Sequence, residues 1–330
     1  MVFTAAQIEL SRRDLVTRAA TLVALTALAG RGIGTASARA GAPEAGGNPF
    51  ADLGLPELAV MITDTGYEGV PAELTAGRYV LAVTNAITAP NPDIPDILDF
   101  AGAGLLKVPA EFTVEELLAM MTAPPALESG STDAGPEGSG PPPWYYETTL
   151  GGGPFARRGE TDYAVIDLTA GDWILWGEDP AAPRLLAGVR VTGDLPADLA
   201  APSGSKRVEM SDFAFAIDPL QTGRQTIELT NVGVQPHFLG LTLVPDGTTV
   251  EDSLALFATL FGDPSATSPA NLSADDLRIV LDSAAQSAGV TAWHSVDLVA
   301  GTYAAVCFII DPATGLPHTM LGMAQLVVVA

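Results

Sequence analysis

The sequence has few of the residues on which disulfides, histidine-rich metal centres and nucleic-acid surfaces depend. Among 330 residues there are one cysteine, Cys307, and three histidines. A single cysteine excludes any disulfide within the chain. Lysine and arginine together number 15, against 39 aspartates and glutamates, which gives a net charge of −24. So acidic a surface repels phosphate backbones, and we expect no nucleic acid among the partners.

The residues that are plentiful favour a globular, turn-rich β protein. Hydrophobic residues make up 48% of the chain, and there are 34 glycines and 26 prolines. Glycine and proline are the main turn formers, whereas they interrupt helices. The length allows two ordinary domains, each with a core of its own. Beyond residue 40 no apolar run approaches the roughly 20 residues that cross a bilayer, so we expect no membrane span in the mature chain.

Residues 1–40 are similar to a twin-arginine export signal. The pair Arg12-Arg13 precedes a modest apolar run over residues 19–30, which is too short to span a bilayer as a stable helix. Small residues over positions 36–40 fit a cleavage site. A membrane anchor is the alternative interpretation of this segment. The signal predicts an exported protein, located in the periplasm, at the cell surface or outside the cell.

The two halves of the chain share an internal repeat. Gly77-Arg78 and Gly223-Arg224 each begin a strand-like run of the same length that ends in Thr-Asn. Two further matches follow in the same order: Val108-Pro109 with Val244-Pro245, and Asp167–Gly171 with Asp297–Gly301. Because repeats of this length correspond to repeated folding units, we predict one domain over residues 41–194, a linker over 195–205 and a second domain over 206–330.

Local patterns assign mostly strands to these domains, with short helical insertions. Alternating or β-rich runs predict strands over Gln225–Thr230, Thr302–Cys307 and Ala324–Val329. Helices are predicted over Val250–Phe261 and Ala274–Ala288, each preceded by a capping residue, Thr249 or Ser273. The Gly/Pro/Ser/Glu-rich stretch over residues 124–143 predicts a disordered loop within the first domain.

Possible metal ligands gather toward the end of the second domain. The segment Asn231–His237 is followed by Gly301-Thr302-Tyr303 leading to Cys307, then by Pro317-His318 and Gly322-Met323. This pattern resembles the cupredoxins, the blue (type 1) copper proteins, over about residues 206–330 and, in degraded form, over 55–193. The resemblance implies a mostly β fold of two tandem Greek-key β-sandwich domains. It also implies a single copper ion bound by His237, Cys307, His318 and Met323.

The chemistry of these four side chains supports the resemblance. Two imidazoles and a thiolate form a trigonal set that suits copper, with a thioether as a weak axial ligand. A bound copper ion would also keep Cys307 as a thiolate, which accounts for a lone cysteine in an exported protein. The segment between Cys307 and His318 is longer than the family's. We predict that a turn over Asp311–Gly315 brings the chain back, so that His318 can lie beside Cys307.

Each of these residues also has a structural interpretation. Alone, His237 would be a hydrogen-bonded loop residue, Cys307 a core residue and Met323 a packing residue. His294 matches no ligand position of the family; we interpret it as structural and hold it as the reserve imidazole. Met320 is a weaker axial candidate than Met323, because no glycine precedes it.

The first domain has lost the ligands. It contains neither histidine nor cysteine. Carried across the repeat, the ligand positions and their neighbours predict these matches: Gly177 for Cys307, Trp173 for Tyr303, Arg184 for His318 and Val189 for Met323. Asp93, Asp96 and Asp99 could in principle meet a hard cation such as Ca²⁺, but a solvated acidic loop is the favoured interpretation. We therefore expect the first domain to serve as a packing or docking partner.

Two kinds of function remain open from the sequence. The first is an exported copper protein that transfers electrons to an unknown redox partner. The second is a metal-free double β-sandwich that acts as a cell-surface or extracellular binding or structural module. We predict that the chain is not an enzyme, because multicopper oxidases and nitrite reductases need further histidine ligands and this chain has three histidines in all.

Overall fold

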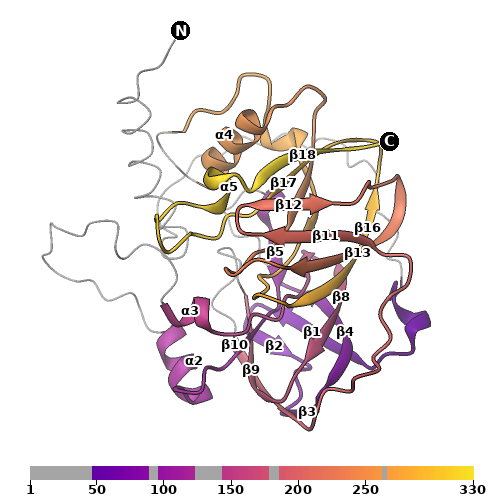
Figure 1. Ribbon diagram of the computed structural model, residues 1–330, viewed down its shortest axis with the longest axis vertical. Coiled ribbons are helices and arrows are strands. Elements are labelled where there is room, and N and C mark those ends of the chain that lie inside the picture. Colours follow the sequence, from indigo (N-terminus) through magenta and orange to yellow (C-terminus); the bar gives the residue numbers. More distant parts are fainter. Residues whose placement is uncertain (1–46, 89–95, 123–142, 178–185, 262–265) are drawn as a thin grey trace, which may run out of the picture.

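The computed structural model describes residues 47–88, 96–122, 143–177, 186–261 and 266–330 (Figure 1). The expected signal segment, and all but the last residue of the expected disordered loop, lie outside these ranges.

The first half of the chain consists of short strands with two helices. Its strands are β1 (Glu57–Thr63), β2 (Gly66–Glu68), β3 (Glu73–Thr75), β4 (Gly77–Asn85), β5 (Phe100–Gly102), β6 (Gly104–Lys107), β7 (Phe155–Arg157), β8 (Thr161–Leu168), β9 (Gly171–Trp176) and β10 (Leu186–Thr192). Its helices are α2 (Val114–Thr122) and α3 (Pro143–Glu147), with 3-10 turns at Ala51–Leu53 and Asp96–Leu98.

The second half has a similar but shorter order of strands. Its strands are β11 (Lys206–Ser211), β12 (Ala214–Ile217), β13 (Gly223–Asn231), β14 (Gly240–Val244), β15 (Arg278–Asp282), β16 (Thr291–Leu298), β17 (Gly301–Val306) and β18 (Ala324–Val329). Its helices are α4 (Val250–Leu260) and α5 (His318–Leu321), with a 3-10 turn at Ala274–Asp276.

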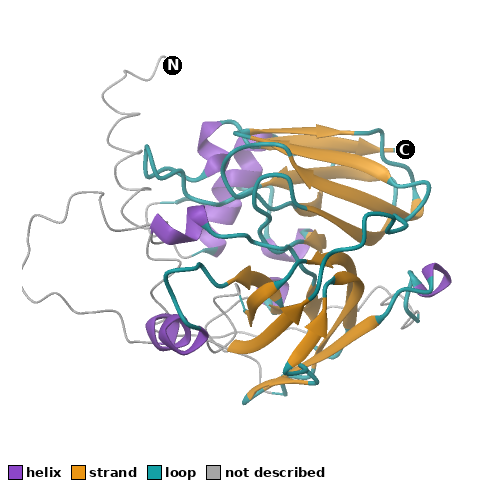
Figure 2. Ribbon diagram, turned by 60° about the horizontal axis from the view of Figure 1, so that its bottom comes forward, coloured by secondary structure: helices purple, strands orange, loops and turns teal. Residues whose placement is uncertain are grey.

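The strands form two sandwiches that share one sheet. An eight-stranded sheet runs in the order β12-β11-β13-β16-β8-β4-β1-β2, and two four-stranded sheets, β3-β10-β9-β6 and β15-β14-β17-β18, pack against its two halves. Figure 2 shows the two sandwiches one above the other. The expected architecture of two β-sandwiches, mostly β with short helical insertions, is confirmed. The joining of both halves in one sheet was not foreseen.

Matching hydrogen bonds show that the repeat is structural. Trp173 in β9 donates its indole N–H to a carbonyl four residues earlier, at 2.8 Å, and the hydroxyl of Tyr303 in β17 does the same at 2.9 Å. Threonine hydroxyls pair across β4 and β8 at 2.8 Å and across β13 and β16 at 2.9 Å. The predicted match of Trp173 with Tyr303 therefore holds.

One of the two predicted helices forms and the other does not. Helix α4 begins after Thr249, whose side chain and that of Asp252 each accept a hydrogen bond from the other's backbone N–H. The helix predicted over residues 274–288 is wrong, because only the 3-10 turn Ala274–Asp276 follows Ser273. The chain then continues as β15, which pairs antiparallel with β14. Pairing with an existing strand outweighs the local helical pattern.

The strand register corrects the predicted match between the two last strands. In the first half Leu186 pairs with Trp176, and in the second half Ala324 pairs with Val306. Since β9 and β17 correspond, Leu186 matches Ala324, and Val189 therefore matches a residue within β18 rather than Met323. The sequence-based alignment of Gly188 with Gly322 was therefore wrong by several residues. Arg184 lies outside the described residues.

One aspartate of the acidic segment that contains Asp93, Asp96 and Asp99 forms an ion pair within the protein. Asp99 forms an ion pair with Arg158, while Asp93 lies outside the described residues. Among the described residues, the one group of candidate metal ligands does not include these aspartates.

The two halves meet where β16 pairs with β8 through Trp293↔Val165 and His294↔Ala164. The guanidinium of Arg78 stacks over the Trp293 ring at 4.3 Å, so a first-half residue contacts the second half directly. The same guanidinium forms two 2.7 Å hydrogen bonds with Asp167 and donates to the carbonyls of Leu199 and Ala200. Arg78 thus ties together both halves and the segment between them.

Replacing Arg78 by methionine should lower the free energy of unfolding by about 2 kcal/mol. The Arg78 side chain is 9% exposed, so its loss leaves Asp167 and the two carbonyls without their donors. Arg190→Met is the matched control, because Arg190 pairs with Asp172 in the same two-bond geometry but is 63% exposed. Chemical denaturation should show a lower midpoint for Arg78→Met and an unchanged one for Arg190→Met. Equal effects would contradict the joining role of Arg78.

Candidate metal centre

The alternation of β17 directs Cys307 into the sandwich. Tyr303, Ala305 and Cys307 belong to the buried cluster between the sheets, whereas Ala304 and Val306 belong to a second cluster on the opposite face. Alternate residues of a strand point to opposite faces, so Cys307 continues the inward series although it lies just past the end of the strand. Its side chain is fully buried.

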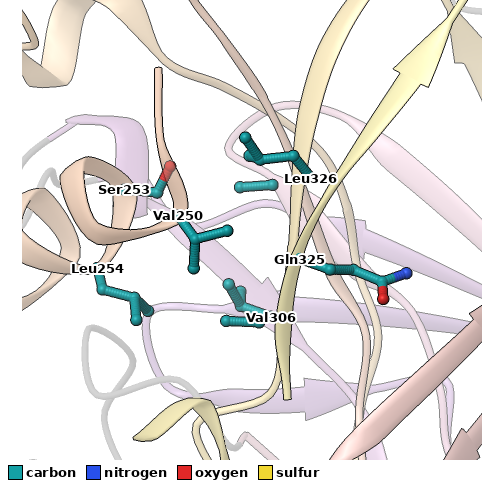
Figure 3. A pocket seen from close by; sticks show the side chains of 8 residues that line it. Val250, Ser253, Leu254, Val306, Gln325 and Leu326 are labelled. Carbon is teal, nitrogen blue, oxygen red and sulfur yellow. The ribbon is translucent and has the colours of Figure 1, made fainter. Parts of the chain in front are cut away.

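Helix α4 covers the opposite face of β17, on the side of the sheet away from Cys307. A small, mostly apolar hollow between α4 and β18 is lined by Val250, Leu254, Val306 and Leu326, among others (Figure 3). These side chains lie on the other side of the sheet from Cys307. The hollow therefore plays no part in the cluster described next.

The chain between Cys307 and His318 folds back on itself, as the sequence predicted. Ile310 and Pro317 form an isolated β-bridge, and the N–H of Asp311 donates to the carbonyl of Leu316 at 2.8 Å. The N–H of His318 donates to the carbonyl of Ile309 at 2.8 Å, which fixes the start of α5. As a result His318 Nδ1 lies 3.6 Å from Cys307 Sγ.

The loop after β13 brings His237 to the same point. Asn231, at the end of β13, donates its amide to the carbonyls of Gln235 and Gln286 at 2.7 and 2.8 Å. His237 and Gln286 exchange both backbone hydrogen bonds, at 3.0 and 2.8 Å. The Nδ1 atom of His237 then lies 3.1 Å from Nδ1 of His318. The ligand atoms of His237, Cys307 and His318 all lie within 4.8 Å of one another, and the three side chains are fully buried.

The outer edge of each imidazole has its own hydrogen-bond partner. Nε2 of His237 lies 3.0 Å from a carboxylate oxygen of Asp212. Nε2 of His318 lies 3.0 Å from Oε1 of Gln235, whose Nε2 donates to Asp311 at 2.8 Å. Carboxylate and amide oxygens only accept, so both imidazoles carry their proton on Nε2. Both Nδ1 atoms therefore present lone pairs to each other.

Neither imidazole takes a second proton to relieve this arrangement at neutral pH. Burial, together with the nearby His237, lowers the pKa of His318 to about 4. Burial also lowers the pKa of His237, although Asp212 acts in the opposite direction. Two lone pairs facing each other at 3.1 Å repel, and a cation between them turns the repulsion into two coordinate bonds.

The donor set fits a copper ion. Two imidazole nitrogens and one sulfur in a buried site are soft and borderline donors, which favour copper or zinc over Mg²⁺ or Ca²⁺. His237, Cys307 and His318 would hold the ion, and in each histidine the Nδ1 atom faces the cluster.

The structure places Met323 beside the cluster. Met323 is fully buried, and its N–H donates to the carbonyl of His318 at 2.9 Å. Its carbonyl accepts from the N–H of Cys307 at 3.2 Å, so its backbone bridges two of the expected ligands. Met320 lies in α5 and is only partly buried.

The reserve histidine does not join the cluster. His294 lies in β16, fully buried, and neither ring nitrogen has a hydrogen-bond partner in the described part of the chain. Burial lowers its pKa to about 4. The interpretation of His294 as a structural residue agrees with this position.

Sequence reasoning missed the residues that surround the two imidazoles. Asp212 and Phe213 lie in the turn between β11 and β12, and the Phe213 ring packs edge-on against His318 at 5.2 Å. Asp311 was noted only as part of a turn, and Gln235 only as part of the motif that ends in His237. Because Gln235 lies two residues before His237, a role for its carboxamide near the cluster could have been suspected from the sequence. Nothing in the sequence connects Asp212 with His237.

Comparisons with known proteins find likeness among solved structures alone. No protein-family model and no curated protein matches the sequence. Auracyanin from Roseiflexus castenholzii is 17% identical with a TM-score of 0.26, covering 39% of this chain and 99% of the auracyanin. Auracyanin A from Chloroflexus aurantiacus, named a blue copper protein, is 22% identical with a TM-score of 0.25, covering 38% and 96%. The copper nitrite reductase from Nitrosomonas europaea is 12% identical with a TM-score of 0.21, covering 83% and 93%.

At these identities and TM-scores we draw no functional inference from the matches; the assignment of the site rests on its own geometry. Within the described residues no helix is both long enough and apolar enough to cross a bilayer.

Proposed function

We propose that this chain is an exported electron-transfer protein with one type 1 copper site in its second half. The observation that carries the proposal is the pair of Nδ1 atoms of His237 and His318, 3.1 Å apart, with Sγ of Cys307 3.6 Å from Nδ1 of His318. A bound copper ion would supply a one-electron redox centre. Met323 completes the proposed ligand set as a weak axial donor.

Features of the protein around the site suit electron transfer rather than catalysis. His237, Cys307 and His318 are fully buried and their backbones are fixed by hydrogen bonds, so little rearrangement accompanies a change of charge. In the described part of the chain one group of three or more candidate ligand side chains comes together. That no further metal is bound, and that the chain is not an enzyme, are therefore parts of the proposal.

The redox partner would approach over the loop that carries His237. Val232 and Val234 on this loop are 54% and 80% exposed, which is unusual for valine next to a buried site. The chain's net charge of −24 favours a partner with a basic surface. The sequence-based expectation of export remains part of the proposal, because the segment that carries the signal lies outside the described residues.

Titration of the metal-free protein with Cu(II) tests the proposal directly. We expect one equivalent to bind and to produce a strong thiolate-to-copper absorption at about 600 nm that reductant bleaches reversibly. Binding with a stoichiometry well below one, or without this absorption, would rule out the type 1 site. If no copper is bound, the metal-free binding module would be the better account of the double sandwich.

A further inference from the structure

His237 is hydrogen bonded to a carboxylate that comes from a different part of the fold. Asp212 lies in the tight turn between β11 and β12, and Phe213 in the same turn has φ +66°, in the left-handed region that side chains rarely adopt. The Asp212 side chain is 34% exposed, whereas the His237 side chain is fully buried. One edge of the buried imidazole therefore reaches a charge at the boundary with solvent.

The carboxylate of Asp212 is fixed in place by backbone donors. Its oxygens accept from the N–H of Val234 at 3.0 and 3.2 Å and from the N–H of Gln235 at 3.1 Å. These donors belong to the loop that carries His237. Because the carboxylate is held from three sides, its position relative to the ring is set by the fold.

The glycine at position 233 leaves the space in which this contact forms. A Cβ atom on Gly233 would lie 2.5 Å from Oδ1 of Asp212 and 2.9 Å from Nε2 of His237. Real Cβ atoms do not approach other atoms so closely, so any other residue would push the ring and the carboxylate apart. The sequence and the backbone thus combine to keep Asp212 against His237.

The two imidazoles of the cluster differ in this respect. His237 faces a carboxylate at 3.0 Å, whereas His318 faces the neutral amide of Gln235 at 3.0 Å, with Asp311 one hydrogen bond further away. A carboxylate that accepts the N–H of a metal-bound imidazole makes the other nitrogen more basic and typically changes metal affinity 10- to 100-fold. The extra electron density favours the more highly charged ion.

We propose that Asp212 is a positioning residue that makes the site prefer Cu(II) over Cu(I) and so holds its reduction potential down. The inference rests on the proposed copper site. Asp212 acts through His237: it fixes the proton on Nε2, aims Nδ1 at the cluster and places a negative charge along the axis of the ring.

Replacing Asp212 by asparagine tests the charge while keeping an acceptor oxygen for Val234, Gln235 and His237. We expect about tenfold weaker Cu(II) binding, with a smaller change for Cu(I). A tenfold change in the ratio of the two dissociation constants corresponds to about 59 mV for one electron, so the reduction potential should rise by that order. Competition titrations with a Cu(II) chelator and a Cu(I) chelator measure the ratio, and a redox titration followed at the thiolate-to-copper band measures the potential independently.

Two variants separate the effect of the Asp212 charge on His237 from other effects. Asp218→Asn removes the same charge from the opposite end of the β11–β12 hairpin, where Asp218 accepts from the N–H of Arg207 at 2.9 Å, and it should leave the ratio unchanged. Asp212→Glu retains a carboxylate and should stay closer to the original protein than Asp212→Asn. A far-ultraviolet spectrum and a denaturation midpoint for each variant show whether it is folded.

An unchanged ratio in Asp212→Asn, or an equal change in Asp218→Asn, would overturn the role of Asp212. If the ratio is unchanged because Cu(II) and Cu(I) binding weaken equally, Asp212 only holds the loop. Each of these results leaves the copper site standing if the original protein binds one equivalent with the expected absorption. Failure of the original protein to do so would instead remove the proposed function.

Discussion

The Cys307→Ala variant should lose the absorption at about 600 nm completely when copper is added. This absorption arises from charge transfer between the thiolate and the metal, and the chain has no other cysteine that could replace the donor. The two imidazoles remain in the variant, so we expect weak Cu(II) binding with only a faint absorption. Visible absorption and a chelator competition on the metal-free protein loaded with one equivalent measure both effects.

The Met320→Leu variant is the matched control for this loss. Met320 lies in α5, close in sequence to the cluster, but Met323 is the proposed axial ligand. The intense band should persist in Met320→Leu with little change. A band that survives in Cys307→Ala would mean that the sulfur of Cys307 is not a ligand, and the type 1 assignment would fail.

The second large effect, on the pH dependence of stability, is expected at His294, which is not one of the proposed ligands. Its side chain lies on the inward face of β16, between Val296, which belongs to the same buried cluster as Cys307, and Ala292, which belongs to the buried cluster of the first sandwich. Burial lowers its pKa to about 4, against about 6.5 in an unfolded chain. As the pH falls below 6.5 the unfolded chain takes up the proton first, so this residue withdraws stability between pH 6.5 and about 4. The full loss is roughly 3 kcal/mol.

Replacing His294 by leucine should remove this dependence. At pH 7 the variant should be at least as stable as the original protein, because the buried ring nitrogens have no hydrogen-bond partner among the described residues. At pH 4 it should be more stable by a few kcal/mol. Denaturant titrations of metal-free protein at both pH values measure the difference, and parallel pH profiles of the two proteins would contradict the assignment.

The comparison between variants is needed because other, partly buried groups act in the opposite direction. Burial raises the pKa of Asp162 and of Asp282 to about 7. As the pH falls from 7, each of these carboxyls therefore takes up its proton in the folded state before it does so in the unfolded state. These two groups add stability as the pH falls from 7 toward 4. The profile of the original protein therefore combines opposing contributions, and only the difference between the two proteins isolates His294.

The parts of the fold that could be predicted from the sequence were those with a local cause. The alternation in β13 and the capping pair at Thr249 and Asp252 are properties of neighbouring residues, and both elements formed where the pattern placed them. The segment over residues 274–288 has helical spacing and a capping residue, but β14 offers it an edge to pair with. Likewise, nothing in β8 or β16 alone indicates that these strands pair across the repeat.

The same division applies to the site. His237, Cys307 and His318 were identifiable because their order and the residues around them resemble the cupredoxin pattern, and the fold-back before His318 follows from turn-forming residues. The partners of the rings were not identifiable. Asp212 reaches His237 from a neighbouring hairpin only once β11 and β13 lie side by side, and the hydrogen bond of Gln235 to Asp311 forms only after the fold-back is made.

The pairing of β16 with β8 also gives the half without candidate ligands a structural part in the other half. In the sheet order β16 would be the outermost strand of the second sandwich, and β8 the outermost strand of the first. A free outermost strand exposes backbone donors and acceptors that recruit other chains and lead to aggregation. Because β16 and β8 pair with each other, neither is a free edge, and we expect the ligand-free copy to protect this side of the second sandwich from self-association, while β12 and β2 remain the outermost strands of the joined sheet.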